Sequence, residues 1–294
     1  SALRRLSQKG NLRFIMSKKS THEQESESSR SLNEKAVPAV SFPESMDTAS
    51  FTVSEILKAP MPLTHRAPTK WLTKLTLLLF GNKVVEVRGL RHINPDMDPF
   101  ILALNHSQKL EAIYIPALLH FLRKGKLIHF LADWNFCLVP GIWMLYYFGE
   151  VIMVARKPAR PKFLNVFKPM FVKGQGSFDQ ALDALESGQS LGVFPEGTTN
   201  RQPEVLLKGY SGVAQMSLKT GIPIVPAGIR FPTHSNEHPI SEYIPFTIEF
   251  GDPIHPGPPQ KKPALKKVRD SHFEVMSAIS KLSGKTWNRQ QRKK

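Results

Sequence analysis

The stretch FILALNHSQKLEAIYIPALLHFLR, residues 100–123, changes character part-way along, and this change decides the fold. Residues 100–104 form a short apolar run, which indicates a buried strand. Residues 108–123 form a longer run that is typical of a helix. The polar residues between the two runs therefore lie where a strand stops and a helix starts. Open α/β sheets bind their ligands at such places.

Working outward from this stretch, apolar runs of strand length alternate with longer helical runs. The predicted strands are residues 84–88, 100–104, 127–131, 151–155, 190–194, 224–229 and 246–250. The predicted helices are residues 108–123, 136–147, 176–187, 209–220 and 262–282. This alternation predicts an α/β fold in a single domain. We expect a mixed, largely parallel central sheet of about seven strands, flanked by helices.

The N-terminal part differs in composition. Residues 17–50 are rich in Ser, Glu and Lys and have few large apolar residues, so we expect them to be disordered. Residues 58–68 contain three prolines and are typical of an extended linker. We therefore divide the chain into a disordered or targeting tail, residues 1–60, and a folded domain, residues 61–294. Folded structure is expected to begin near Thr69.

The start of the chain allows two interpretations. Residues 1–20 contain no acidic residue and several Arg, Lys and Ser residues, a composition found in organelle transit peptides. Met16 begins an ordinary polar N-terminus, so a start at this residue is the alternative. Both interpretations stay open, and the compartment stays open with them.

The net charge of +16 calls for an anionic partner. Residues 1–60 carry nine basic and seven acidic residues, so the excess lies in residues 61–294, which carry 31 and 17. Nucleic acid, an anionic membrane surface and a phosphorylated substrate each fit this charge, and solubility alone is the fourth interpretation. The single cysteine, Cys137, excludes an intrachain disulfide framework and a Cys-rich zinc site.

Two apolar segments bear on membrane contact. Residues 69–80, TKWLTKLTLLLF, are too few to span a bilayer, which takes about 20 apolar residues. They form either a helix that lies on a membrane or a helix that covers the core, and we favour the core helix. Residues 136–148 contain Pro140 and Gly141, so we reject a transmembrane helix there as well.

The first candidate site residues lie in the motif NHSQKLE, residues 105–111. Histidine accepts a proton near neutral pH because its unperturbed pKa is about 6.5. Glu111, in the first helical turn, could reach back to His106, fix its tautomer and stabilise the imidazolium. The structural alternative makes Glu111 a favourable charge at a helix N-terminus and His106 a turn residue. On this motif alone the structural alternative is favoured.

A second polar motif, FPEGTTNR, follows the predicted strand 190–194 directly. Pro195 ends that strand, and Gly197 lets the backbone approach a ligand closely. Glu196 can accept hydrogen bonds from a substrate hydroxyl. The side chains that can donate to a phosphate are those of Thr198, Thr199 and Arg201. As a bare loop, the motif is equally well explained as a turn.

Two basic residues complete the set of candidates. Arg156 follows the predicted strand 151–155, and a surface arginine is the default explanation. An arginine at the same sheet edge as two other polar loops is nevertheless a good phosphate clamp. Lys208 precedes a predicted helix and the proline-bounded strand IPIVP, residues 222–226, whose prolines structure alone would justify.

Along the chain, the motifs are NHSQKLE, the strand that ends at Arg156, FPEGTTNR, and Lys208 with the strand IPIVP. In this order and at these intervals, the four motifs resemble the glycerolipid acyltransferase family of the lysophosphatidate (1-acylglycerol-3-phosphate) type. The resemblance covers about residues 80–235, and FPEGTT with an upstream NH box is its most specific pairing. In that family the histidine of the NH box deprotonates the acceptor hydroxyl, which attacks an acyl-CoA or acyl-carrier-protein thioester. The resemblance implies that His106 is the general base. The residues implied to bind the acceptor are Arg156, Glu196, Gly197, Thr198 and Thr199, with Lys208 assisting at the phosphate.

The chain departs from the family pattern at two positions. The family ends its first box in Asp, whereas this chain has Glu111. One extra methylene re-aims the imidazole contact by about 1 Å, and a misplacement of that size can cost about a hundredfold in rate. We expect Glu111 to work as the orienter, and a weakened or repurposed enzyme is the alternative. Thr199 stands where arginine is frequent, so Arg201 joins the acceptor-binding set as a substitute.

The resemblance thus implies an acyltransferase of phospholipid biosynthesis, with 1-acylglycerol-3-phosphate as the first-choice acceptor. The implied partners are an acyl thioester donor, a lysophospholipid or glycerol phosphate acceptor, and an anionic membrane surface. We expect peripheral association with a membrane, and no metal, cofactor or nucleic acid, because no P-loop, dinucleotide fingerprint or nucleic-acid motif is present. A lipid or thioester hydrolase and a non-catalytic lipid-binding protein are the alternatives, and the chain lacks the G-x-S-x-G elbow of many hydrolases.

Overall fold

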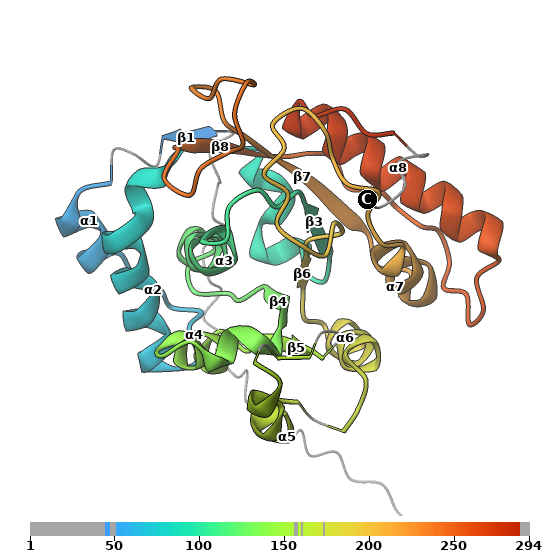
Figure 1. Cartoon of the computed structure of the whole chain (residues 1–294), viewed down its shortest axis with the longest axis horizontal. Coiled ribbons are helices and arrows are strands. Elements are labelled where there is room, and N and C mark those ends of the chain that lie inside the picture. The colour runs from blue at the N-terminus through green and yellow to red at the C-terminus, as the bar shows by residue number, and fades with distance from the viewer. Residues whose placement is uncertain (1–44, 48–50, 156–157, 160, 173, 289–294) are drawn as a thin grey trace, which may run out of the picture. The chain divides into compact units, whose positions relative to one another are not determined.

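A computed structural model describes the folded part of the chain (Figure 1). The described residues are 45–47, 51–155, 158–159, 161–172 and 174–288. The chain divides into two units, Ser1–Val40 and Ser41–Lys294, and every described residue belongs to the second. The predicted disorder before residue 45 and the choice between two starts therefore lie outside the described residues.

A central sheet organises the described part of the chain. It has eight strands in the order β1-β2-β8-β7-β3-β6-β4-β5. The strands are β1 (Ser45–Asp47), β2 (Val84–Arg88), β3 (Ile101–Leu104), β4 (His129–Asp133), β5 (Ile152–Val154), β6 (Leu191–Val193), β7 (Ile224–Arg230) and β8 (Phe246–Phe250). Paired strands run parallel except for β1 with β2 and β7 with β8. The predicted α/β fold with a mixed, largely parallel sheet is confirmed, and β1 is an additional edge strand.

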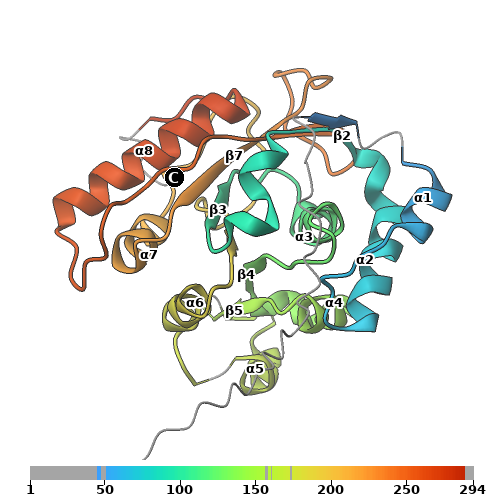
Figure 2. The same ribbon diagram turned by 180° about the vertical axis from the view of Figure 1, so that it is seen from behind.

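Helices flank this sheet (Figures 1 and 2). The α-helices are α1 (Val53–Lys58), α2 (Ala67–Phe80), α3 (Glu111–Leu122), α4 (Ile142–Phe148), α5 (Lys168–Phe171), α6 (Ser177–Glu186), α7 (Gly212–Thr220) and α8 (Leu265–Ser283). The predicted helix 136–147 is divided into the 3-10 turn η4 (Trp134–Leu138) and α4. Pro140 and Gly141 lie at the break, and Gly141 has a φ of 84° that a regular helix cannot accommodate. A second 3-10 turn, η5 (Lys162–Phe167), precedes α5.

The strand β3 shows why helices are needed on both faces. All four of its side chains are buried. Leu102 and Leu104 pack in a core with residues of α3, whereas Ile101 and Ala103 pack in a second core with residues of α6, α7 and α8. Successive side chains of a strand point to opposite faces, so a strand that is buried on both faces has a continuous apolar sequence. The run at residues 100–104 is of this kind.

The folded part begins before residue 60, where the sequence placed the end of the tail. Helix α1 begins with a capping box, in which Glu55 N donates to Thr52 Oγ1 (3.2 Å) and Thr52 N donates to Glu55 Oε2 (2.7 Å). Its Ile56 is buried in the same core as α3. The Thr-x-x-Glu signal is therefore present in the sequence, but the polar composition around it predicted disorder.

Helix α2 has an inverted pattern of burial. Its exposed apolar side chains recur at helical spacing and are Trp71, Leu75, Leu78 and Leu79. Its buried face is largely polar: Thr73 Oγ1 hydrogen-bonds His120 Nδ1 (2.7 Å), and Lys74 Nζ donates to the carbonyl oxygen of Ala59 (3.0 Å). The favoured prediction of a core helix therefore describes only one side of α2. Within the described residues, every helix is too short or too polar to cross a membrane.

Close packing of α8 on β7 generates a prediction. A Cβ added at Gly228 would lie 2.2 Å from the carbonyl carbon of Leu282, which is backbone and cannot rotate away. We expect Gly228→Ala to lower the free energy of unfolding by about 3 kcal/mol, as measured by chemical denaturation. Gly212→Ala is the control, because nothing lies within 4 Å of its added Cβ. For Gly212→Ala we expect the free energy of unfolding to change by no more than about 1 kcal/mol. An equally small change for Gly228→Ala would contradict the close packing of α8 on β7.

Candidate active site

Two polar loops meet at the carboxyl edge of the sheet. Strand β6 lies between β3 and β4, and the three strands are parallel, so the segments that leave them lie together. The NHSQKLE motif leaves β3, and FPEGTTNR leaves β6. The loops are joined through the backbone of His106: its N donates to the side-chain oxygen Oε1 of Glu196 (3.3 Å), and its carbonyl oxygen accepts from Asn200 N (2.7 Å).

Asn105 anchors the first loop to the sheet. Its Nδ2 donates to the carbonyl oxygen of Ile229 (3.1 Å), and its Oδ1 accepts from Ile229 N (2.7 Å). The amide thus continues the hydrogen bonding between β3 and β7 by one side chain, because its planar group carries an NH2 donor and a C=O acceptor side by side. Because Asn105 is fully buried, its position fixes where the next residue, His106, begins.

The side chain of His106 is held by Glu111. The Nδ1 atom of His106 lies 2.8 Å from Glu111 Oε2, and the same oxygen accepts from Ser107 N at 2.8 Å. An ionised carboxylate can only accept hydrogen bonds, so the proton of a neutral imidazole lies on Nδ1 and leaves Nε2 as the acceptor. Glu111 is fully buried, and its other oxygen has no hydrogen-bond partner among the described residues.

The unprotonated nitrogen of His106, Nε2, faces the second loop. Thr199 Oγ1 lies 3.2 Å from Nε2, and the tautomer set by Glu111 makes the hydroxyl the donor. The imidazole also stacks on Phe194, with ring centroids 4.3 Å apart. Two perpendicular constraints, one carboxylate and one aromatic face, therefore hold the ring in a single orientation. A histidine in this state can accept a proton from a group that displaces or joins the Thr199 hydroxyl.

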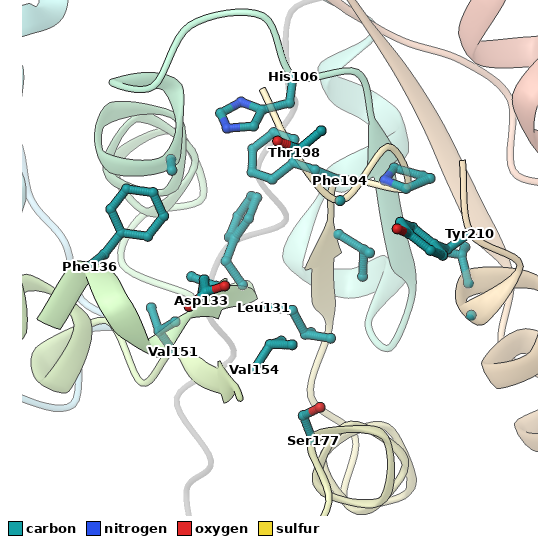
Figure 3. Close-up of a pocket in the computed structure, with 18 of the residues that line it drawn as sticks. His106, Leu131, Asp133, Phe136, Val151, Val154, Ser177, Phe194, Thr198 and Tyr210 are labelled. Atoms are coloured by element: carbon teal, nitrogen blue, oxygen red, sulfur yellow. The ribbon is translucent and has the colours of Figure 1, made fainter. Parts of the chain in front are cut away.

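His106 lies at one end of an apolar cavity (Figure 3). The cavity has a volume of about 450 Å³, within the range of small-molecule sites. Apolar side chains dominate its lining and include Leu131, Phe136, Val151, Val154, Phe178 and Phe194. The polar groups are few: beside His106 they include Asp133, Thr198, Thr199 and Tyr210. Such a lining suits a flexible hydrocarbon chain whose reactive end lies near the imidazole.

Glu196 is directed into the protein and does not line this cavity. Its Oε2 accepts from Asn200 Nδ2 (2.7 Å) and Leu207 N (2.8 Å), while its Oε1 accepts from His106 N. Burial raises the pKa of this carboxyl group, and these hydrogen bonds together with the charge of Lys285 oppose the rise. The contacts make Glu196 the organiser of both loops, and its predicted contact with substrate stays a prediction.

The other predicted residues divide into two groups. Gly197 and Thr198 line the cavity beside Thr199. Arg201 and Lys208 lie outside the lining, and Arg201 Nε donates to a carbonyl oxygen in the segment before β8 at 2.6 Å. Arg156 lies outside the described residues. Among the described residues, His, Cys, Asp and Glu side chains form no group of three that could hold a metal ion.

Three functional residues were missed by the sequence analysis. Asn200 joins the loops through its backbone N, which donates to the carbonyl oxygen of His106 (2.7 Å), and its Nδ2 holds the second loop by donating to Glu196 Oε2 (2.7 Å) and to the carbonyl oxygen of Val205 (2.7 Å). Asp133 lines the cavity at the carboxyl end of β4, a position that the strand pattern could have marked. Lys285, far along the chain, reaches the same loops. Its neighbours in the sequence carry no motif that could have identified it.

Comparisons with known proteins place the site in a protein family. The chain matches a family model described as Acyltransferase over residues 84–230, half of its length. This range contains both loops of the site. No curated protein sequence matches the chain. A similar solved structure is the 1-acyl-sn-glycerophosphate (LPA) acyltransferase PlsC from Thermotoga maritima, with 20% sequence identity, a TM-score of 0.48, and coverage of 77% of this chain and 81% of that chain.

The anchoring role of Asn105 can be measured through stability. Asn105→Ala leaves the N–H and C=O groups of Ile229 without their side-chain partners, so we expect the free energy of unfolding to fall by about 3 kcal/mol. Urea denaturation followed by circular dichroism gives this value. The matched control is Asn236→Ala, an exposed position, with an expected change within about 0.5 kcal/mol. Equal stability of the two variants would contradict the anchoring role.

Proposed function

Because this chain belongs to the acyltransferase family, we propose that it moves a fatty acyl group from a thioester to a hydroxyl of a phosphate-bearing glycerolipid precursor. The acceptor proposed first is 1-acylglycerol-3-phosphate, and the donor is acyl-CoA or acyl-carrier protein. One observation carries the proposal. The unprotonated Nε2 of His106, whose ring is oriented by Glu111, lies at the end of an apolar cavity that can hold an acyl chain.

The proposed reaction uses His106 as general base and then as general acid. Nε2 removes the proton of the acceptor hydroxyl while the oxygen attacks the thioester carbonyl carbon and a C–O bond forms. The tetrahedral intermediate then collapses, the C–S bond breaks, and the thiol leaves with the proton that the imidazolium returns. Glu111 stabilises the imidazolium between these steps, as a buried carboxylate does beside a catalytic histidine.

The length of Glu111 does not prevent this role. The contact of 2.8 Å with Nδ1 is that of a charge-assisted hydrogen bond, although the side chain is one methylene longer than the family aspartate. The second hydrogen bond, from Ser107 N to the same oxygen, fixes the carboxylate independently of the histidine. This geometry supports an active enzyme over a binding protein that has lost its chemistry.

The acceptor's phosphate is proposed to bind at the mouth of the site. Gly197 and Thr198 line the cavity, and the hydroxyl of Thr198 is a donor of the kind that a phosphate needs. Arg156, on the segment that leaves β5, and the positive excess of residues 61–294 supply charge for the same anion. Lys208 and Arg201 do not line the cavity, and Arg201 donates to a backbone carbonyl oxygen, so their proposed share is smaller.

The base and its orienter are tested by substitution. We expect His106→Ala to reduce kcat about a thousandfold and Glu111→Gln to reduce it about a hundredfold, because the first removes the proton acceptor and the second removes its charged partner. Transfer of labelled acyl groups to lysophosphatidate measures both. His238→Ala, an exposed histidine, is the control and should keep full activity. Near-normal turnover by a folded His106→Ala variant would overturn the mechanism.

The same assay decides between transfer and hydrolysis. It is run with glycerol 3-phosphate, lysophosphatidate and zwitterionic lysolipids, each with acyl-CoA and acyl-carrier-protein donors, and free fatty acid is measured in parallel. Acylated product that depends on a phosphate-bearing acceptor supports the proposal. Fatty acid release at a rate that ignores the acceptor would assign the site to a hydrolase instead.

We also propose that the enzyme works on a membrane surface and binds it through the outward face of α2. Trp71 on that face is 63% exposed, and an exposed apolar stripe opposite a polar buried face is typical of interfacial helices. Helix α2 is joined to α4 by the hydrogen bond from Thr69 Oγ1 to the carbonyl oxygen of Phe148 (3.0 Å). Helix α4 and the turn η5 add further exposed apolar side chains, namely Trp143, Tyr147, Phe163 and Val166.

Vesicle binding tests this surface. The double variant Trp71→Asp/Leu75→Asp should lower the partition coefficient onto anionic phospholipid vesicles by about tenfold, because two apolar side chains no longer enter the interface. Co-sedimentation measures the bound fraction, and 1 M salt should weaken binding of the wild type. Leu265→Asp, at an exposed leucine of α8, should bind like the wild type. Unchanged binding by the double variant would exclude the α2 face.

A further inference from the structure

The segment after α8 returns to the site. Helix α8 ends at Ser283 and is capped by Gly284, whose φ of 71° reverses the chain direction. Thr286 then pairs with the loop that follows FPEGTTNR: Thr286 N donates to the carbonyl oxygen of Glu204 (2.7 Å), and Leu206 N donates to that of Thr286 (2.9 Å). Trp287 Nε1 donates to the carbonyl oxygen of Lys208 (3.3 Å). Residues 285–287 are therefore packed along the second loop of the site.

Lys285 extends from this segment between the two loops. Lys285 is only 3% exposed, which is unusual for a lysine. Its Nζ donates to Ser107 Oγ (2.8 Å) in the first loop and to the carbonyl oxygen of Gln202 (2.7 Å) in the second. One ammonium group thus bridges both segments, in addition to the contacts that His106 makes with Phe194, Glu196, Thr199 and Asn200.

Lys285 interacts with the charges of two buried carboxylates, those of Glu111 and Glu196. Glu111 and Glu196 are both buried beside His106, and a buried carboxylate is costly unless it is paired. Lys285 attracts both carboxylates, while burial lowers the pKa of its own ammonium group. Tyr114 also faces Glu111, and its pKa is raised chiefly by burial and further by that carboxylate. Lys285 is thus a buried cation whose charge acts on both carboxylates.

We propose that Lys285 is a positioning residue for acyl transfer: its ammonium group holds the two loops together and balances the charges of Glu111 and Glu196, so that the imidazole of His106 stays oriented. This role rests on the proposed function. It acts through Ser107 and Gln202 and involves no contact with substrate. The residue lies well beyond the range that matches the acyltransferase model, which ends at residue 230.

Lys285→Met removes the charge and keeps a long apolar stem. We expect kcat to fall about a hundredfold, as for misplaced catalytic groups, with the acceptor KM changed less than about twofold. Loss of the positive charge makes the potential at His106 more negative and favours the imidazolium, which cannot act as a base. The acid limb of the kcat/KM profile should therefore move to higher pH. Lys285→Arg keeps the charge and should keep the limb in place.

Lys281→Met is the matched control, because Lys281 is an exposed lysine four residues earlier. It should retain the kcat and the pH profile of the wild type. A folded Lys285→Met variant with wild-type kcat and an unmoved acid limb would overturn the proposal. A fall in kcat with an unmoved limb would also overturn the electrostatic role, since a merely structural defect lowers kcat in this way.

A stability measurement covers the case in which Lys285→Met unfolds or the wild type has no acyl transfer. In a double-mutant cycle with Glu196→Gln, the second substitution removes the carboxylate that Lys285 balances. The fall in melting temperature caused by Lys285→Met should be at least halved in the Glu196→Gln background. Equal falls in both backgrounds would overturn the charge pairing. Absence of transfer by the wild type, with the coupling intact, would overturn the proposed function alone.

Discussion

The parallel register of β3 and β6 is the constraint on which the site depends. Ile101 pairs with Leu191 and Ala103 with Val193, and the same offset of 90 residues continues past the strand ends, where His106 N meets Glu196. Two loops that are distant in the sequence therefore present their residues at matching heights. Because a register shift moves every side chain of a strand, a slip here would separate His106 from Glu196 and Thr199 of the second loop.

Charge compensation in a dry environment is the second requirement. The carboxylates of Glu111 and Glu196 lie under an apolar cavity, where electrostatic interactions are stronger than in water. Backbone N–H groups stabilise these carboxylates by hydrogen bonds, and the ammonium group of Lys285 stabilises them by its charge. The fold thus supplies fixed donors to the anions before any substrate arrives, and the imidazole needs no rearrangement to accept a proton.

Much of the fold could be predicted because its signals are local. A strand buried on both faces, such as β3, has a continuous apolar run, and Pro195 and Gly197 mark the exit from β6. The pairing of the two motifs was predicted for the same reason, since parallel strands end at one edge. The boundary of the tail at residue 60 did not anticipate α1, which a capping box begins and whose Ile56 is buried.

Other features depend on contacts that no local pattern encodes. The direction in which α2 turns its apolar face is decided by its neighbours, because Thr73 and Lys74 find partners in α3 and in the segment before α2. Glu196 was predicted to face substrate, but its lone pairs are taken by Asn200, Leu207 and the first loop. Lys285 belongs to this group too, and its position has a consequence for synthesis. A chain growing on the ribosome displays both catalytic loops some eighty residues before the lysine that joins them has been added. Because a domain generally folds as a unit, the pocket around His106 is complete only after the segment that contains Lys285 has been synthesised and has packed against both loops.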